Sequence, residues 1–216
     1  MERWGIFGFG HYLSDIADII HARQDRICAI INNINPTEKQ WEDLKRRIAL
    51  FGYDVPVIEI SDFKPRPDEK YFYGFFDGRD QVLADFKRNY GIMFSPLVHP
   101  AAYLGSNVRY GEGALISPHA VIGPNSRIGN FTRVNRASTI GHDTEIGDFS
   151  DVAPGAAIAG RVWIGNRTMI GIGSTVIDGI HIGSNSVVGA GSVVVKDVPD
   201  NVVVVGVPAK ILRKNE

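Results

Sequence analysis

A histidine followed directly by an aspartate, His142-Asp143, is the pair in this sequence best suited to acid–base chemistry. A histidine can take a proton from an attacking nucleophile near neutral pH, and such a base contributes about 10²–10⁴-fold to a rate. The adjacent carboxylate can accept the imidazole Nδ1–H, which fixes the tautomer and stabilises the charged ring. Gly160 follows 18 residues later, and its backbone N–H is a candidate donor to a developing oxyanion.

A second candidate site is the segment Gly8-Phe9-Gly10-His11. Its glycines would let backbone N–H groups approach a phosphate at the start of a helix, although a plain strand-to-helix turn has the same composition. As a dinucleotide fingerprint it is incomplete, because Leu13 replaces the third glycine and Asn32, not an acid, follows the second predicted strand. The sequence therefore argues against NAD.

The composition describes an ordinary globular chain of 216 residues with a net charge of −1. This balance of charge gives no support for a nucleic-acid or anionic-membrane partner. The single cysteine, Cys28, excludes an internal disulfide and a multi-cysteine zinc site. Without an apolar run of 18 residues or a signal-peptide core, the sequence predicts a cytoplasmic protein.

A strict six-residue repeat occupies the second half of the chain. Between Leu104 and Val194, sixteen positions six residues apart include fourteen Ile or Val, and glycine follows ten of them. Neither the helical period of 3.6 nor the strand period of 2 explains this spacing. The repeat predicts a parallel β-helix of about five coils, in which three hexads close one coil and residues 18 apart are stacked. His142 and Gly160 would then share a corner.

The first 95 residues have no such repeat. They alternate apolar strands with amphipathic helices, which predicts a small parallel, Rossmann-like βαβ sheet. We expect one domain over residues 1–95 and a β-helix with a C-terminal tail over residues 96–216. Strands are predicted at Arg3–Phe9, Ile27–Ile31, Val55–Ile60 and Tyr71–Phe76, and helices at Leu13–Ile20, Thr37–Leu50 and Arg79–Tyr90.

The hexads, Gly141-His142-Asp143 and the ending Gly206-Val207-Pro208-Ala209-Lys210 resemble bacterial hexapeptide acyltransferases. With a βαβ domain placed in front, the chain resembles the sugar acetyltransferases of the NeuD/PglD type. The resemblance implies a left-handed β-helix, acetyl-CoA as co-substrate, a nucleotide-linked amino sugar as acceptor, no metal, and a homotrimer with acetyl-CoA between subunits.

The resemblance also implies roles for single residues. His142 is the base, Asp143 holds it, the Gly160 N–H binds the oxyanion and Lys210 lies along coenzyme A, near its 3′-phosphate. A purely structural role in a corner turn is the alternative for His142, Gly160 and Asn135, and a solvated basic tail is the alternative for Lys210. The expected sugar-nucleotide contacts are Gly8, Gly10, His11, Asn32, Asp77 and Asn135.

Several residues depart from the family pattern, and all lie in the expected nucleotide and sugar pocket. The glycine loop is one residue shorter, Tyr12 replaces a glycine, Asn32 replaces an acid, and Phe76-Asp77-Gly78 replaces a Gly-Asn/Asp-Asn stretch. The identity of the nucleotide and the sugar is therefore open.

Three other functions compete with N-acetyl transfer. An O-acetyltransferase for a sialic-acid-type sugar would use the same base. A zinc carbonic anhydrase would need a close histidine pair, whereas His119, His142 and His181 are 23 and 39 residues apart. A non-catalytic prism that binds a sugar nucleotide is the third.

Overall fold

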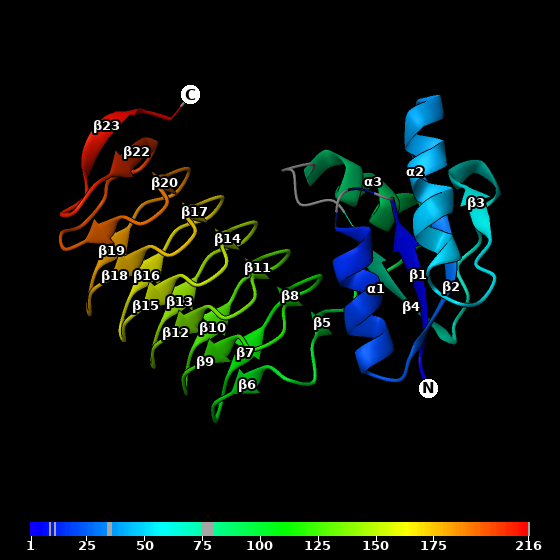
Figure 1. Cartoon of the computed structure of the whole chain (residues 1–216), viewed down its shortest axis with the longest axis horizontal. Helices are drawn as coiled ribbons and strands as arrows, with labels where there is room; N and C mark the ends of the chain where they lie inside the picture. The colour runs from blue at the N-terminus through cyan, green and yellow to red at the C-terminus, as the bar shows by residue number, and fades with distance from the viewer. Residues whose placement is uncertain (9, 11, 34–35, 75–79, 216) are drawn as a thin grey trace. The chain divides into compact units, whose positions relative to one another are not determined.

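The computed structural model describes residues 1–8, 10, 12–33, 36–74 and 80–215. The chain divides into two compact units, Met1–Leu97 and Val98–Glu216 (Figure 1). Each of the described helices is too short or too polar to span a bilayer.

The first unit is built on a four-stranded sheet in the order β3-β2-β1-β4, and all of its neighbouring strands are parallel. The Rossmann-like expectation is thus confirmed for this unit. Its strands are β1 (Arg3–Phe7), β2 (Arg26–Asn32), β3 (Val57–Glu59) and β4 (Glu69–Tyr73). Its helices are α1 (Leu13–Ala22), α2 (Glu38–Ala49), α3 (Asp80–Tyr90) and the 3₁₀ turn η1 (Ile60–Asp62).

Local sequence signals explain where these elements begin. Thr37 and Gln40 form the predicted capping box of α2, with the Gln40 N–H donating to the Thr37 hydroxyl. α1 buries the stripe that includes Leu13, Ile16 and Ile20. β4 ends at Tyr73, and Gly74 follows it outside the strand, so the strand is shorter than the predicted Tyr71–Phe76, of which Phe75 and Phe76 lie outside the described residues.

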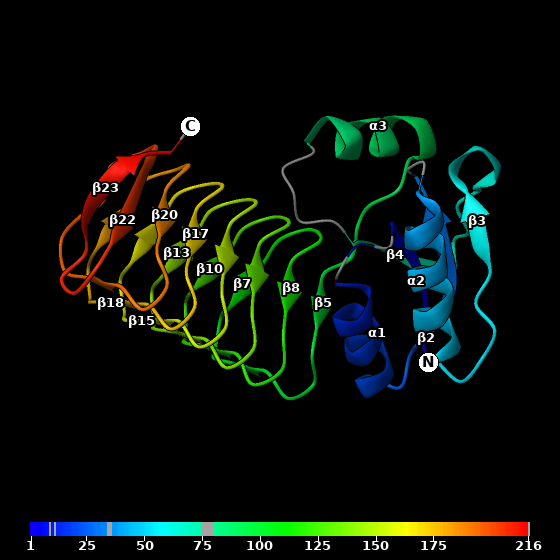
Figure 2. The ribbon, with the colours of Figure 1, turned by 45° about the horizontal axis from the view of Figure 1, so that its top comes forward.

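The second unit is a three-sided parallel β-helix, whose stacked coils are visible in Figures 1 and 2. One side, which we term face C, consists of β6 (Tyr103–Leu104), β9 (Val121–Ile122), β12 (Thr139–Ile140), β15 (Ala157–Ile158), β18 (Thr175–Val176) and β21 (Val193–Val194). Face D consists of β7 (Arg109–Tyr110), β10 (Arg127–Ile128), β13 (Glu145–Ile146), β16 (Trp163–Ile164) and β19 (His181–Ile182). Face B consists of β5 (Leu97–Val98), β8 (Leu115–Ile116), β11 (Arg133–Val134), β14 (Asp151–Val152), β17 (Met169–Ile170), β20 (Val187–Val188), β22 (Val202–Val205) and β23 (Lys210–Lys214).

The 18-residue register is confirmed strand by strand. Thr139 of β12 pairs with Ala157 of β15, and the inward Ile140 pairs with Ile158. The repeated Ile and Val side chains form one continuous core. Only the first two hexads depart from this pattern, since Leu104 is half-buried and Tyr110 is exposed.

Small polar residues line the core beside the apolar rows, and their hydroxyl groups bond to the corners. The Ser126 hydroxyl donates to the carbonyl of Gly141 at 2.9 Å, and the Thr144 hydroxyl to that of Ala159 at 3.2 Å. Both side chains are fully buried, so these bonds satisfy polar groups that water cannot reach. The small residue that recurs in the hexads therefore serves hydrogen bonding as well as space.

Candidate functional site

The His142-Asp143 pair lies at the corner that connects β12 of face C to β13 of face D. Asp143 adopts a left-handed backbone, φ 53°, which aspartate tolerates better than most residues. This turn directs both side chains away from the core, and each is about half exposed. The pair is therefore held by a rigid repeat and open to a substrate.

The His142 Nδ1 atom lies 2.6 Å from Asp143 Oδ2. Because an ionised carboxylate only accepts hydrogen bonds, Nδ1 carries the proton and Nε2 is the basic nitrogen. The hydrogen bond from His142, and then that from Asn125, holds the pKa of Asp143 below its usual value. The Asp143 carboxylate is thus charged at every pH at which the imidazole can act as a base.

Asn125 is a further member of this corner. It lies one coil below Asp143, and its Nδ2 donates to Asp143 Oδ1 at 3.2 Å. Asn107, another coil below, donates to Asn125 Oδ1 at 3.2 Å. This ladder orients the carboxylate toward His142, and the 18-residue spacing that links His142 to Gly160 would also have identified it.

Gly160 lies against the imidazole, one coil above. A Cβ atom built on Gly160 would lie 2.7 Å from His142 Nε2 and 2.9 Å from its Cε1, closer than real Cβ atoms come. The Gly160 N–H donates to no acceptor among the described residues. The structure thus brings together the basic nitrogen of His142 and a backbone N–H, that of Gly160, which is not engaged in a hydrogen bond with a described residue, as the sequence spacing predicted.

Lys210 and Asn135 lie elsewhere on the β-helix. Lys210 begins β23, an exposed strand antiparallel to β22, where the sequence left a solvated tail open as an alternative. Asn135 follows β11 at the corner between faces B and C. Its side chain is buried, and Oδ1 accepts the Arg136 N–H at 2.8 Å, so within one chain it is a turn residue on a different corner from His142.

In the first unit, the expected pocket residues lie where parallel strands end. Gly8 has φ 78° and donates its N–H to Ile31, so this N–H is occupied by the sheet. Asn32 is buried, and its Nδ2 donates to both oxygens of Glu59 at 2.9 and 3.0 Å. Asn32 therefore holds a carboxylate, supplied by β3, at the edge where the family pattern has an acid. His11 and Asp77 lie outside the described residues.

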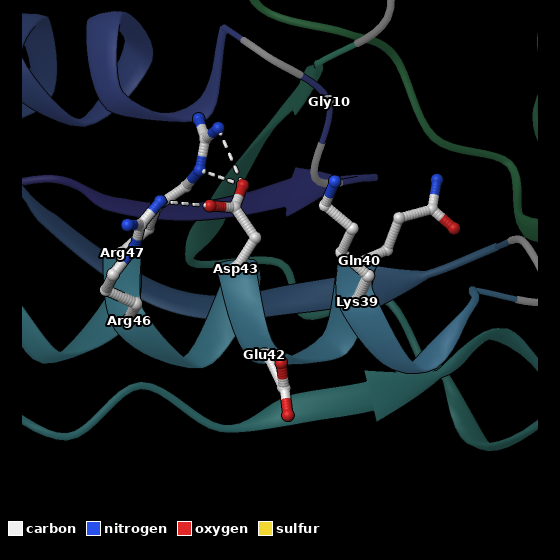
Figure 3. A pocket seen from close by; sticks show the side chains of 7 residues that line it. All are labelled: Gly10, Lys39, Gln40, Glu42, Asp43, Arg46 and Arg47. Atoms are coloured by element: carbon white, nitrogen blue, oxygen red, sulfur yellow. Dashed lines mark hydrogen bonds and ion pairs between the residues drawn. The ribbon is translucent and has the colours of Figure 1, made fainter.

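Gly10 lines a cleft of about 530 Å³ together with residues of α2. Figure 3 shows the Lys39 and Gln40 side chains extending from α2 on the side of Gly10, whereas Glu42 points away. Asp43 binds the guanidinium groups of Arg46 and Arg47, and the Lys39 ammonium has no acidic partner among the described residues that line this cleft. Lys39 was not among the residues predicted from the sequence, because a glycine-loop motif specifies only the residues of the loop itself.

No three His, Cys, Asp or Glu side chains within the described ranges gather closely enough to hold a metal ion.

The comparisons with known proteins agree with this geometry. The family model for the hexapeptide repeat of succinyl-transferase matches residues 161–196, and solved hexapeptide-repeat acetyltransferases match nearly the whole chain. The chain thus contains a hexapeptide repeat, and its second unit has the fold of a left-handed β-helix, as the sequence predicted. No curated protein sequence matches it at a significant level.

Three of the matching structures illustrate the similarity. Perosamine N-acetyltransferase from Caulobacter crescentus, in a variant bound to CoA and GDP-perosamine, is 28% identical with a TM-score of 0.79, over 98% of this chain and 97% of that one. The acetyltransferase domain of PglB from Neisseria gonorrhoeae, bound to acetyl coenzyme A, is 24% identical with a TM-score of 0.81, over 98% and 99%. WeeI from Acinetobacter baumannii is 24% identical with a TM-score of 0.78, over 98% and 100%.

Proposed function

We propose that this protein transfers the acetyl group of acetyl-CoA to the amine of a nucleotide-linked amino sugar. The observation that carries the proposal is the corner where His142 Nδ1 is held at 2.6 Å by Asp143 while Nε2 faces Gly160. The activity of the matching perosamine N-acetyltransferase, bound to CoA and GDP-perosamine, favours an amine over a hydroxyl as the acceptor.

In this mechanism the sugar amine attacks the thioester carbonyl carbon directly. His142 Nε2 accepts the proton of the amine, and the carbonyl oxygen becomes an oxyanion that the Gly160 N–H stabilises. The C–S bond then breaks, the acetyl group stays on the sugar nitrogen, and the CoA thiolate takes the proton from the imidazolium. Asp143 keeps Nδ1 protonated and stabilises the positive ring during the step.

The first unit supplies the proposed sugar-nucleotide pocket. Lys39, across the cleft from Gly10, provides a positive charge suited to a diphosphate. The Glu59 carboxylate, held by Asn32, offers an acceptor for a hydroxyl group at the same sheet edge. His11 and Asp77 remain proposed contacts of the sugar nucleotide.

The proposed assembly is a homotrimer with acetyl-CoA between adjacent subunits and Lys210 near its 3′-phosphate. Asn135 belongs to another corner, so we propose that it contacts the sugar from the adjacent subunit. Sedimentation should give about three times the chain mass of 23.7 kDa. A monomer at micromolar concentration would contradict the intersubunit site. We expect the enzyme in the cytoplasm.

The test is release of CoA thiol from acetyl-CoA with GDP-, UDP- and dTDP-linked amino sugars and free sialic acids. We expect turnover on one amino-sugar nucleotide, and a loss of at least about 100-fold in His142→Ala. His181→Ala is the matched control, because His181 lies on the outside of face D and stacks on Trp163. Turnover on a sialic acid alone would favour the O-acetyltransferase, and silence across the panel in a folded protein would contradict the proposal.

A further inference from the structure

Two corners of the β-helix have the same turn but differ in whether a side chain from the next coil accepts its backbone N–H groups. At the corner after face D, which we term the capped corner, each third-position N–H is bonded by the side chain one coil above. Asn130 N–H donates to Asp148 Oδ1 at 2.7 Å, and Asp148 N–H donates to Asn166 Oδ1 at 2.8 Å. The same bond joins Glu112 to Asn130, Asn166 to Ser184 and Ser184 to Asp200. These N–H groups are unavailable to a ligand.

At the corner after face C, which we term the histidine corner, the stack contains His142, Gly160 and Asp178. Gly160 has no side chain with which to cap His142. Asp178, one coil above Gly160, occupies the position from which Asp148 caps Asn130. Its carboxylate instead pairs with the Arg161 guanidinium. An aspartate that could close the Gly160 N–H is therefore held by a different partner.

Ala159, the residue before Gly160, also keeps Asp178 away from the Gly160 N–H. At the capped corner the capping oxygen lies over a glycine, and a Cβ on Gly129 would be only 2.6 Å from Asp148 Oδ1. The corresponding residue at the histidine corner is Ala159, which has a methyl group at that place. A carboxylate oxygen of Asp178 cannot reach the capping position without meeting this methyl group.

We propose that the Ala159 methyl group and the Arg161–Asp178 ion pair keep the Gly160 N–H open for the substrate. Arg161 is thus a positioning residue that acts through Asp178. This inference rests on the proposed function, in which that N–H binds the oxyanion. A capped N–H could not bind it, and the capping carboxylate would repel the developing negative charge.

The test begins with the double variant Ala159→Gly/Arg161→Ala, which removes both restraints. We expect kcat to fall by about 100-fold or more, the range that loss of one oxyanion donor causes, with the sugar-nucleotide KM little changed. Adding Asp178→Ala should restore kcat to within about threefold of wild type, because no carboxylate then remains to close the N–H. Asp178→Ala alone should change kcat by less than about threefold, since this side chain does not cap Gly160 in the native protein. A structural role for Arg161 would give a loss that the third substitution does not reverse, which would overturn the inference.

A crystal structure of the double variant supplies a readout independent of turnover. We expect a carboxylate oxygen of Asp178 within about 3 Å of the Gly160 nitrogen, as at the capped corner. If Asp178 stays away from Gly160 while Ala159 and Arg161 are both gone, the inference is wrong whatever the activity. If wild-type protein acetylates no sugar, the proposed function fails, and the Asp178–Gly160 distance alone decides the inference.

Discussion

Gly160→Ala tests the contact on which the proposed chemistry depends. The new Cβ would lie 2.7 Å from His142 Nε2, whereas ordinary contacts between such atoms are about 3.5–4.0 Å. The imidazole must therefore move by roughly 1 Å. A shift of that size away from Asp143 would stretch the 2.6 Å bond from Nδ1 to about 3.6 Å, beyond hydrogen-bond range.

The consequence for stability should be small and that for catalysis large. Alanine suits the backbone of Gly160, which lies outside the left-handed region, and the atoms that must move are the end of a half-exposed side chain. We expect a shift in Tm of less than about 3 °C. A misplacement of about 1 Å in the base is expected to lower kcat by about 10²-fold.

The assay is saturating acetyl transfer with thermal unfolding measured on the same samples. A double-mutant cycle with His142→Ala separates the cause, because the two substitutions should not be additive if Gly160→Ala acts through the imidazole. The double variant should then be within about threefold of His142→Ala. If Gly160→Ala retains more than half of the wild-type kcat, the contact between Gly160 and the imidazole is not part of the working geometry.

Three other predictions concern separate parts of the chain. Asp143→Asn should lower kcat by about 10–10²-fold without changing the acetyl-CoA KM, because the amide cannot stabilise the imidazolium. Asp143→Glu should recover part of this loss. Equal rates in wild type and Asp143→Asn would remove the carboxylate from the mechanism. Burial, reinforced by Glu69, raises the pKa of the Cys28 thiol to about 12. At pH 8, iodoacetamide should therefore modify Cys28 at least about 100-fold more slowly in the folded protein than in the unfolded chain. The modification rate of the folded protein should rise with pH until the pH passes that pKa. Lys39→Met should raise the sugar-nucleotide KM about tenfold and leave kcat unchanged. Lys45→Met is the control, because Lys45 lies on the same helix outside the cleft. An unchanged KM in Lys39→Met would exclude Lys39 from the pocket.

The β-helix could be predicted from the sequence because the repeat constrains every residue in the same way. The inward Ile140 and Ile158 pair at a separation of 18, and that number alone places Gly160 above His142. Identical coils leave no choice of register, so counting along the sequence is equivalent to measuring in space. The same arithmetic would have identified Asn125 as the partner of Asp143.

The first unit offers no such arithmetic. Local signals predicted its elements, including the capping box of Thr37 and Gln40, because these depend on residues a few positions apart. The partner of Asn32 was not predictable, because Glu59 is 27 residues away and meets it only through the pairing of β2 with β3. The position of Lys39 in the cleft was not predictable either, because it depends on the tertiary packing of α2 beside Gly10.

In a repeat protein, a reactive site is most visible where the sequence departs from its own consensus. At the capped corner, an Asn, Asp or Ser side chain from the coil above accepts the third-position N–H of Glu112, Asn130, Asp148, Asn166 and Ser184. At the histidine corner, Ala159 and Gly160 break that pattern, and an undonated N–H appears beside a basic nitrogen. Leaving a backbone donor without a protein partner costs stability, so the departure needs a compensating role. Binding a charge that develops during a reaction is such a role, and it explains why these departures and the only His-Asp pair of the β-helix occur at one corner.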